Sequence, residues 1–369
     1  MPTALLVSAS GQPNLGDDAL GEAFGAALPG WRTLLATCSP ARPGNGRGAR
    51  SRFDVGSRPT LARALAASDA LVVAGGTVFN TLHGGGRPLS PLHRAVALLG
   101  AARVLGKPRA MVGVGAGVLE SAMSRRLSRA LVLQTDLLVL RDEESADVLA
   151  AAGAPTPFRV GAAPAWTLLD PPPPGPRAPS GPIVVALGAL AGDASLPARL
   201  AAALAPLIEA GHDVRLQPWQ ISGNGSDDLA LGETVNARLP RRLPQLAAPA
   251  NLPEARRLFA EAGLVVSLRF HALVAAAAAG TRFVAHAHEP KHAGLARRLG
   301  QRAVGTREPS AALTRVILDA FERPAPSRAT VQSQIEAAQA GMQLLRVLLA
   351  GGDAPAPDEI EGLPFSPAS

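Results

Sequence analysis

Two residues with catalytic potential, Arg269 and His271, stand where an apolar run gives way to a helix-like segment. The run, GLVVSLR at 263–269, is almost continuously apolar, which is typical of a buried parallel strand. A guanidinium that emerges from such a strand needs an opposite charge, because a buried unpaired charge is costly. The neighbouring sequence offers no obvious partner for Arg269, so we expect an anionic ligand to pair with it and His271 to act on that ligand.

Two adjacent carboxylates follow another apolar run, ALLVSAS at 4–10. Asp17 or Asp18 can cap the helix that is expected to begin there, but one cap needs only one of them. The other could accept a proton or a hydrogen bond from a substrate hydroxyl. Asn14 and Gly16 belong to the same stretch and are candidates for contacts with the substrate.

Glycines are expected to end two further apolar runs, at 70–76 and 110–117. A strand-to-helix turn made of glycine lets the backbone approach a phosphate or a sugar closely. We therefore predict that Gly75, Gly76 and Gly115 cradle a substrate, with close packing as the alternative reading. The stretch GVGAGV lacks the third glycine of a dinucleotide-binding fingerprint.

Two more cations could help to hold an anion. Arg141 ends the run LLVLRD and could clamp a carboxylate or phosphate with two parallel hydrogen bonds. The alternative for Arg141 is an ion pair with the acids that follow it in LRDEES. Lys291 lies in FVAHAHEPKHAG and could add positive charge to the same site.

The stretch that contains Lys291 also holds several potential metal ligands. Imidazoles and a carboxylate are ligands that suit zinc. The residues in question are His286, His288, Glu289 and His292, and a proline separates the last of them from the others. We expect no metal site, because this spacing does not place the ligands on one face.

Strand-like and helix-like segments alternate along the chain, which predicts the elements that must position these residues. The fold class is α/β, with two doubly wound Rossmann-like domains facing across a cleft. The proline-rich stretch 171–182 predicts the linker. The expected parts are an N-terminal domain (1–170), a C-terminal domain (183–325), a closing helix (326–350) and a disordered tail (351–369).

Composition narrows the class of partner. The 369 residues carry a formal charge of +7, but the arginines are scattered and aromatic residues make up only 3%, so we do not expect a nucleic-acid-binding protein. Anionic small substrates or an anionic membrane surface fit this charge better. The sequence shows no secretion signal, no transmembrane segment and one cysteine, so we expect a cytoplasmic protein that could work at the inner face of the membrane. The oligomeric state is left open.

Several stretches occur in the order found in one enzyme family. NLGDDALGEAF, VVAGGTVFN, GVGAGV, LLVLRDEESADVLAAAG and VSLRFHALVAAAAAGTRFVAHAHEPKHAGLARRLG resemble the polysaccharide pyruvyl transferases, over about residues 5 to 300. The resemblance implies a fold like that of GT-B glycosyltransferases. The chain departs from the usual pattern at Thr77, where the family has a third glycine, and at 288–291, where its Tyr-Asp-Pro-Lys reads His-Glu-Pro-Lys.

The resemblance also implies a reaction. The donor would be phosphoenolpyruvate, bound by Arg269 and His271 on the side of the C-terminal domain. The acceptor would be a sugar diol on the side of the N-terminal domain, and both lipid-linked and nucleotide-linked acceptors remain open. No cofactor beyond this substrate is implied. Two alternatives remain: a GT-B glycosyltransferase or epimerase that uses a nucleotide sugar, and a polysaccharide-binding protein without activity.

Overall fold

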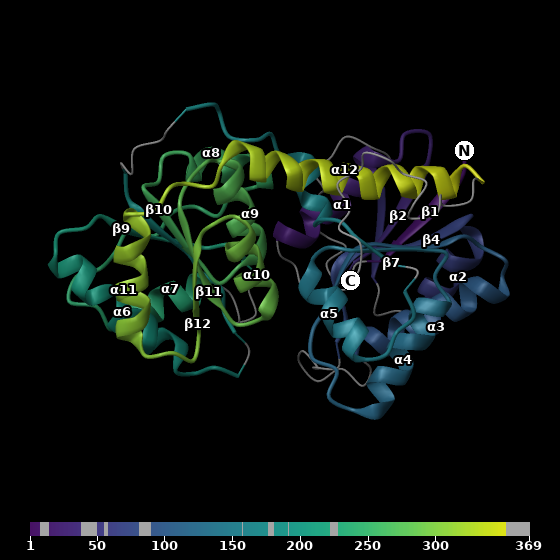
Figure 1. Ribbon diagram of the computed structural model, residues 1–369, viewed down its shortest axis with the longest axis horizontal. Helices are drawn as coiled ribbons and strands as arrows, with labels where there is room; N and C mark the ends of the chain where they lie inside the picture. Colours follow the sequence, from purple (N-terminus) through teal and green to yellow (C-terminus); the bar gives the residue numbers. More distant parts are fainter. Residues whose placement is uncertain are drawn as a thin grey trace. The chain divides into compact units, whose positions relative to one another are not determined.

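The structure is a computed structural model in which the chain folds into two compact units (Figure 1). The first unit comprises mainly Met1–Pro13, Asp17–Leu168 and Ser333–Ser369, and the second mainly Leu169–Gln332. The described residues are 1–7, 15–37, 50–54, 58–80, 90–156, 158–175, 181–190, 192–221 and 228–351. Asn14, part of the expected linker (176–180) and all but one residue of the expected tail lie outside them.

The first unit is built on a parallel sheet with the strand order β3-β2-β1-β4-β5-β6-β7. Its strands are β1 (Thr3–Val7), β2 (Arg32–Thr37), β3 (Arg50–Asp54), β4 (Ala70–Phe79), β5 (Arg109–Ala116), β6 (Leu137–Leu140) and β7 (Phe158–Val160). The chain builds β2 and β3 on one side of β1 and then crosses to place β4 on the other side. The carboxyl ends of β1 and β4 therefore form the topological switch point of this sheet, where ligands of such folds bind.

Helices cover both faces of the first sheet (Figure 1). Alternate side chains of each strand point to opposite faces, so Leu5 packs with the helices on one side and Leu6 with those on the other. The first face carries α2 (Arg58–Ala67), α3 (Pro91–Val104), α4 (Ala122–Leu133) and α5 (Glu143–Ala151). The second face carries α1 (Leu15–Ala27) and the last part of α12 (Arg328–Leu349), and the short 3-10 helix Pro164–Leu168 follows β7.

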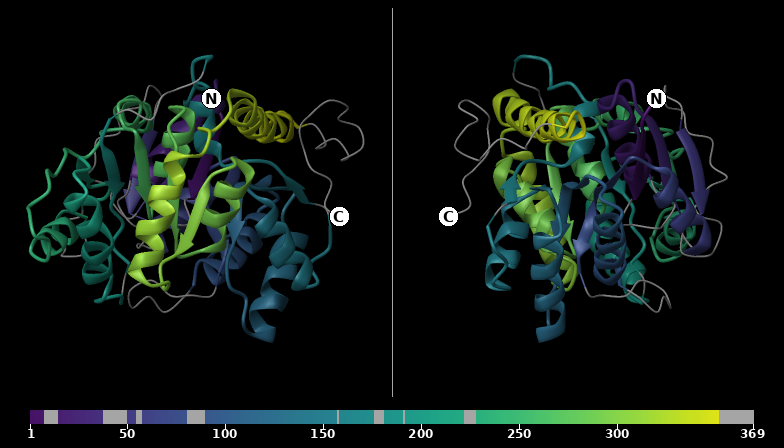
Figure 2. Two further views of the ribbon diagram at one scale, coloured as in Figure 1. Left: turned by 60° about the vertical axis from the view of Figure 1, so that its left-hand side comes forward. Right: turned by 90° about the vertical axis from the view of Figure 1, so that its right-hand side faces the viewer.

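The second unit has a smaller parallel sheet with the order β12-β11-β10-β8-β9. Its strands are β8 (Ile183–Ala186), β9 (Val214–Gln217), β10 (Leu264–Ser267), β11 (Phe283–Ala287) and β12 (Arg302–Gly305). The left-hand view of Figure 2 brings the β12 edge forward, with β12 and α11 in yellow-green. Because β9 lies on one side of β8 and β10 on the other, the switch point lies at the carboxyl ends of β8 and β10.

Two layers of helices enclose the second sheet (Figure 1). The helices α6 (Leu196–Glu209), α7 (Asp228–Asn236) and α11 (Ser310–Phe321) pack on one face. The other helices are α8 (Leu252–Phe259), α9 (Phe270–Ala278) and α10 (Pro290–Arg298). Most of α9 is alanine and fully buried, so a helix can approach the sheet closely directly behind Arg269. Within the described residues, no helix is both long and apolar enough to cross a membrane.

Candidate active site

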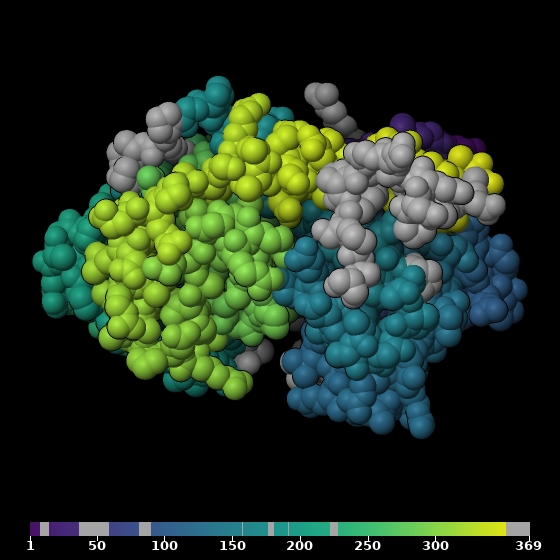
Figure 3. Space-filling view, in the orientation of Figure 1, coloured from purple at the N-terminus to yellow at the C-terminus, as the bar shows by residue number. Residues whose placement is uncertain are grey.

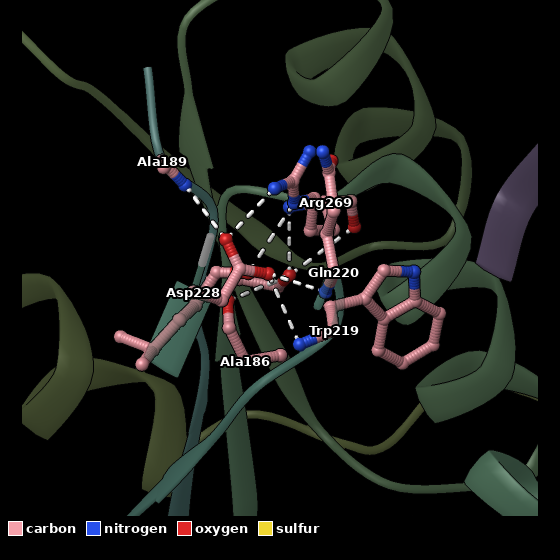
Figure 4. Close-up of polar contacts among 8 residues, drawn as sticks. Ala186, Ala189, Trp219, Gln220, Asp228 and Arg269 are labelled. Atoms are coloured by element: carbon pink, nitrogen blue, oxygen red, sulfur yellow. Dashed lines mark hydrogen bonds and ion pairs between the residues drawn. The ribbon is translucent and has the colours of Figure 1, made fainter. Parts of the chain in front are cut away.

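An ion pair between Arg269 and Asp228 lies at the switch point of the second unit (Figure 4). The guanidinium Nη2 donates to Asp228 Oδ1 over 2.8 Å, and its Nε donates to the carbonyl oxygen of Leu187 over 3.4 Å. The aspartate side chain is fully buried, whereas 21% of the arginine side chain is exposed. The neighbouring sequence contains no partner for Arg269, but the protein supplies one from 41 residues away, so a ligand is not the only anion that pairs with this guanidinium.

Asp228 joins three loops that follow neighbouring strands. Besides Arg269, its carboxylate accepts hydrogen bonds from the backbone N–H groups of Ala189 (2.9 Å), Trp219 (3.0 Å) and Gln220 (2.7 Å). Figure 4 shows all four donors pointing at this one carboxylate. A carboxylate has about four acceptor positions, so Asp228 is saturated and holds the guanidinium in one orientation.

The backbone around Arg269 is also fixed. Its N–H donates to Ser267 Oγ over 2.8 Å, and the Ser267 hydroxyl lies 3.2 Å from the Arg269 carbonyl oxygen and 3.3 Å from that of Ala186. A Cβ atom on Gly188 would come within 3.1 Å of Arg269 Nε, so glycine leaves room for the arginine side chain there. The guanidinium is thus preorganised while part of it stays accessible.

A series of ring contacts links His271 to the turn after β11. The His271 ring packs edge-to-face on Phe270 at 5.5 Å, and Phe270 packs in the same way on His292 at 6.2 Å. The ring of His292 lies 4.4 Å from that of His288. The structure therefore brings the predicted residues Arg269, His271 and Lys291 to adjacent strand ends of one sheet.

Glu289 binds two cationic or potentially cationic groups in that turn. Lys291 Nζ lies 2.8 Å from Glu289 Oε2, and His288 Nε2 lies 3.3 Å from Oε1. Burial raises the pKa of the Glu289 carboxyl, but the hydrogen bonds from His288 and Lys291 and the lysine charge outweigh burial and leave this pKa well below its usual range. Glu289 is therefore ionised, and its carboxylate partly neutralises the positive charge of Lys291.

A buried histidine, His286, lies near the end of β11. Burial, together with the charges of Arg199 and His288, lowers the pKa of His286 to about 4, so the ring is neutral at pH 7. Its Nδ1 has no hydrogen-bond partner among the described residues. Arg199 in turn binds Asp193 over 2.6 Å, and hydrogen bonds from Arg199 and Ser195 lower the pKa of Asp193 to about 2.

Metal ligation has no geometric support in the part of the chain that the structure describes. No group of three histidine, cysteine, aspartate or glutamate side chains there could hold a metal ion. The ring of His292 instead packs between Phe270 and His288, and its Nδ1 lies 3.2 Å from the Glu289 carbonyl oxygen. Burial lowers the pKa of His292 well below the usual value.

The first unit contains a second arginine–aspartate pair, at the end of β6. Arg141 Nε donates to Asp142 over 2.8 Å, and Nη2 donates to Thr77 Oγ1 over 3.2 Å. Both members of the pair are buried, and Asp142 also caps α5 by accepting from the backbone N–H of Ser145 at 2.8 Å. The alternative interpretation of Arg141, an ion pair with a following acid, is therefore what the structure shows.

The predicted glycines Gly75, Gly76 and Gly115 lie inside strands and not in the expected strand-to-helix turns. Gly75 and Gly76 adopt positive φ angles of 65° and 79° within β4, which continues to Phe79. A Cβ atom on Gly115, in β5, would come within 2.2 Å of Arg141 Nη2. The space beside Gly115 therefore holds the Arg141 guanidinium. The predicted contacts of these glycines with an acceptor stay a prediction.

Asp17 and Asp18 occupy the first turn of α1, the helix that follows β1 in the sequence. Both are half-buried, and Gly16 lies beside them within the helix. Carboxylates in this turn are stabilised by the helix dipole. Asn14, predicted with them, lies outside the described residues.

Sequence reasoning missed Asp228, Asp193 and Arg199. Asp228 had a usable signal, because it belongs to the pair of acids in GSDDLALG that precedes an apolar helical segment. The requirement that Arg269 be paired could have directed attention to it. Nothing in the sequence around Arg199 marks its proximity to His286, which depends on how α6 packs.

Known structures share this architecture at low sequence identity. The UDP-GlcNAc 2-epimerase from Neisseria meningitidis bound to UDP-GlcNAc is 10% identical with a TM-score of 0.63, over 95% of this chain and all of that one. Anabaena Alr3699/HepE in complex with UDP and glucose is 16% identical with a TM-score of 0.62, again over 95% of this chain and 100% of that one. Such likeness confirms the predicted GT-B-like fold and says nothing about activity. No curated protein matches the sequence.

The family assignment rests on a separate match to the sequence. A family model for polysaccharide pyruvyl transferase matches residues 14–290. The matched range begins just before α1 and ends at the start of α10, so it includes Asp17, Arg141 and Arg269 with the strands that position them. The chain belongs to the polysaccharide pyruvyl transferase family.

Proposed function

We propose that this protein transfers the pyruvyl group of phosphoenolpyruvate to a sugar diol and forms a pyruvate ketal. The observation that carries the proposal is the preorganised, partly exposed guanidinium of Arg269 at the switch point of the second sheet. Its place inside the range matched by the family supports an anionic donor there. Asp228 already neutralises one charge, so the donor would bind the guanidinium N–H groups that Asp228 leaves unused.

The donor carries a carboxylate and a phosphate, and each needs a partner. Arg269 suits one of them because its planar fork can bind two oxygens at once. A second cation, Arg141 or Lys291, would bind the other. Lys291 forms an ion pair with Glu289, and the buried Arg141 donates hydrogen bonds to Asp142 and Thr77. Each cation would therefore bind the donor only by giving up part of these interactions.

The reaction then needs a base and an acid. The carboxylate of Asp17 or Asp18 accepts the proton of the attacking sugar hydroxyl, whose oxygen bonds to C2 of the donor, while protonated His271 delivers a proton to C3. In the second step another hydroxyl of the sugar attacks C2 and the bond from C2 to the phosphate oxygen breaks. The proton of that hydroxyl leaves with the phosphate, and the ketal closes. Positioning and electrostatic stabilisation would supply most of the acceleration, and no cofactor is required beyond phosphoenolpyruvate as substrate.

The alternative donor is a nucleotide sugar. The similar structures named above bind UDP or UDP-GlcNAc, but at their level of identity they share only the fold. The choice between the donors therefore rests on a direct binding measurement.

Isothermal titration of the purified full chain with phosphoenolpyruvate and with UDP-sugars tests the proposal. We expect binding of phosphoenolpyruvate, and weaker binding to Arg269→Ala. His271→Ala should lower kcat more than donor affinity if the histidine transfers a proton. When saccharides are incubated with phosphoenolpyruvate and the enzyme, phosphate should be released from phosphoenolpyruvate and the saccharide should gain a pyruvate ketal. Binding of a UDP-sugar with no binding of phosphoenolpyruvate would overturn the proposal.

A further inference from the structure

Exposed apolar side chains concentrate on one part of the first unit. Half of the ten large apolar residues that are exposed in the described part of the chain fall between residues 104 and 133. Val104 is 87% exposed, Leu133 is 66% exposed and Met123 is 57% exposed, and the remaining two are Leu105 and Val118. Single exposed apolar residues are ordinary, but several on adjoining helices usually mark a surface that binds something.

The helix α3 is apolar on its outer face as well as its inner face. Its inner residues Leu92 and Leu99 are buried in the core, as expected. Its outer line runs through Ala97, Ala101 and Val104, which lie one helical turn apart and are exposed. Exposed apolar residues in such a line form a surface that a partner could cover.

The helix α4 extends this surface. It packs against α3, and a Cβ atom on Gly100 would come within 3.2 Å of Gln134 Oε1, which places the end of α4 beside the last turn of α3. On α4, Met123, Arg126 and Leu133 lie on one exposed face. Both helices reach the surface of the first unit in Figure 3, in blue at the lower right.

The helices α3 and α4 carry side-chain charge of one sign. The sequences of α3 and α4 contain five arginines and no aspartate or glutamate. Arg103, Arg126 and Arg129 are exposed. Apolar residues surrounded by arginines match the interface of an anionic bilayer, where apolar side chains enter the headgroup region and cations bind the lipid phosphates.

We propose that the α3–α4 surface docks on an anionic lipid bilayer. A second copy of the chain is a poorer cover, because a two-fold interface would bring two arginine-bearing helix pairs without acids against each other. The proposal does not depend on the identity of the donor or the acceptor, since it rests only on the exposed side chains of α3 and α4. Its consequence is that the enzyme would work next to membrane-bound saccharides.

Sedimentation of the full chain with vesicles tests this proposal. We expect binding to vesicles of phosphatidylcholine with phosphatidylglycerol, little binding to phosphatidylcholine alone, and weakening at high ionic strength. Val104→Gln with Leu133→Gln should lower the partition coefficient about tenfold or more. Arg126→Gln with Arg129→Gln should lower it about fivefold per arginine.

A matched control exists on α11 of the second unit, where Leu318 and Arg315 are both exposed. Leu318→Gln and Arg315→Gln should leave vesicle binding unchanged, and unchanged melting temperatures of all variants would show that they fold. Absence of binding to anionic vesicles, or equal losses in the control variants, would overturn the proposal. A monomer–dimer equilibrium that Val104→Gln and Leu133→Gln abolish, without vesicle binding, would assign the surface to a second copy instead.

Discussion

Each unit of this protein places an arginine–aspartate pair at the carboxyl ends of its strands, but the two pairs are built differently. Arg141 and Asp142 are neighbours in the sequence, and both are buried. Arg269 and Asp228 come from different loops, and only the aspartate is fully buried. The first pair is closed by Thr77 and by the space that Gly115 leaves, whereas the second leaves part of its guanidinium accessible.

The two arginine–aspartate pairs also differ in how near they lie to the switch point of their sheet. Arg269 follows β10, which borders the switch point of the second sheet. Arg141 follows β6, which is separated from the switch point of the first sheet by β5 and β4. Asp17 and Asp18 lie in the first turn of α1, the first helix after β1, and β1 borders the first switch point. The difference suggests a division of labour, in which the second unit holds the anionic donor and the first supplies a base for the acceptor.

The largest expected effect tests that division in the first unit. If Asp17 or Asp18 takes the proton of the acceptor, its replacement by asparagine should lower kcat about 10²–10⁴-fold. The affinity for phosphoenolpyruvate should change little, because the proposed donor site is at Arg269 in the second unit. Steady-state kinetics and titration calorimetry on Asp17→Asn and Asp18→Asn measure both quantities. If neither variant loses turnover, the base lies elsewhere and the comparison fails.

The next effect concerns the stability of the second unit. Asp228→Ala removes the acceptor of four hydrogen bonds and leaves Arg269 without its partner. We expect the free energy of unfolding to fall by about 3–5 kcal/mol, measured by urea denaturation. Asp213→Ala, which breaks the exposed pair with Arg215, should cost less than about 1 kcal/mol. Equal losses in the two variants would mean that Asp228 is not the residue that joins these loops.

A third prediction concerns how the stability of the folded protein depends on pH through His286 in the second unit. The pKa of His286 is lowered to about 4 by burial, against 6.5 in the unfolded chain. As pH falls below 6.5 the unfolded chain takes up this proton first, so stability falls until about pH 4, where the folded protein is protonated too. The loss amounts to about 3 kcal/mol.

Melting temperatures between pH 7 and pH 4 measure this loss. His286→Gln, which cannot take up a proton, should flatten the pH profile relative to the wild type. His212→Gln, at a histidine that stacks on Phe321, serves as a matched control. A profile that is identical in the wild type and in His286→Gln would show that His286 does not stay neutral in the folded protein.

The smallest effect compares the two arginines directly. Arg269→Lys keeps the charge but loses the planar fork, and we expect the affinity for phosphoenolpyruvate to fall about ten- to a hundredfold. Arg141→Lys should change the melting temperature more than the affinity, because its guanidinium is engaged by Asp142 and Thr77. An equal loss of affinity in both variants would identify Arg141 as the second cation of the donor site and remove the difference between the pairs.

How far the sequence predicted the fold depends on where each strand lies in its sheet. Interior strands such as β1, β4 and β10 are continuous apolar runs, and the sequence predicted them. Three strands were missed, namely β3 (RSRFD), β7 (FRV) and β12 (RAVG), and each lies at the edge of its sheet. An edge strand has a neighbour on one side only and tolerates charged residues, so it leaves no continuous apolar signal.

The same argument applies to the site. The pairing of Arg141 with Asp142 could be foreseen because the two residues are adjacent, whereas the pairing of Arg269 with Asp228 depends on how three loops meet. The strand ends that carry Arg269 and His271 were predicted from apolar runs alone. The lowered pKa of His286 on β11 could not be predicted, because it arises from burial and from the charge of Arg199 on α6.

The last helix of the chain has a consequence for the order in which the protein can fold. Met342, Leu344 and Leu345 of α12 complete the core that β1 and α1 begin, and Arg346 donates to the carbonyl oxygen of Ala27 over 2.7 Å. A ribosome makes the N-terminal residues first, but it supplies these side chains only after the second unit has been synthesised. The unit that opens the chain is therefore the one that must wait, exposed on one face, while the second unit can finish its own core beforehand.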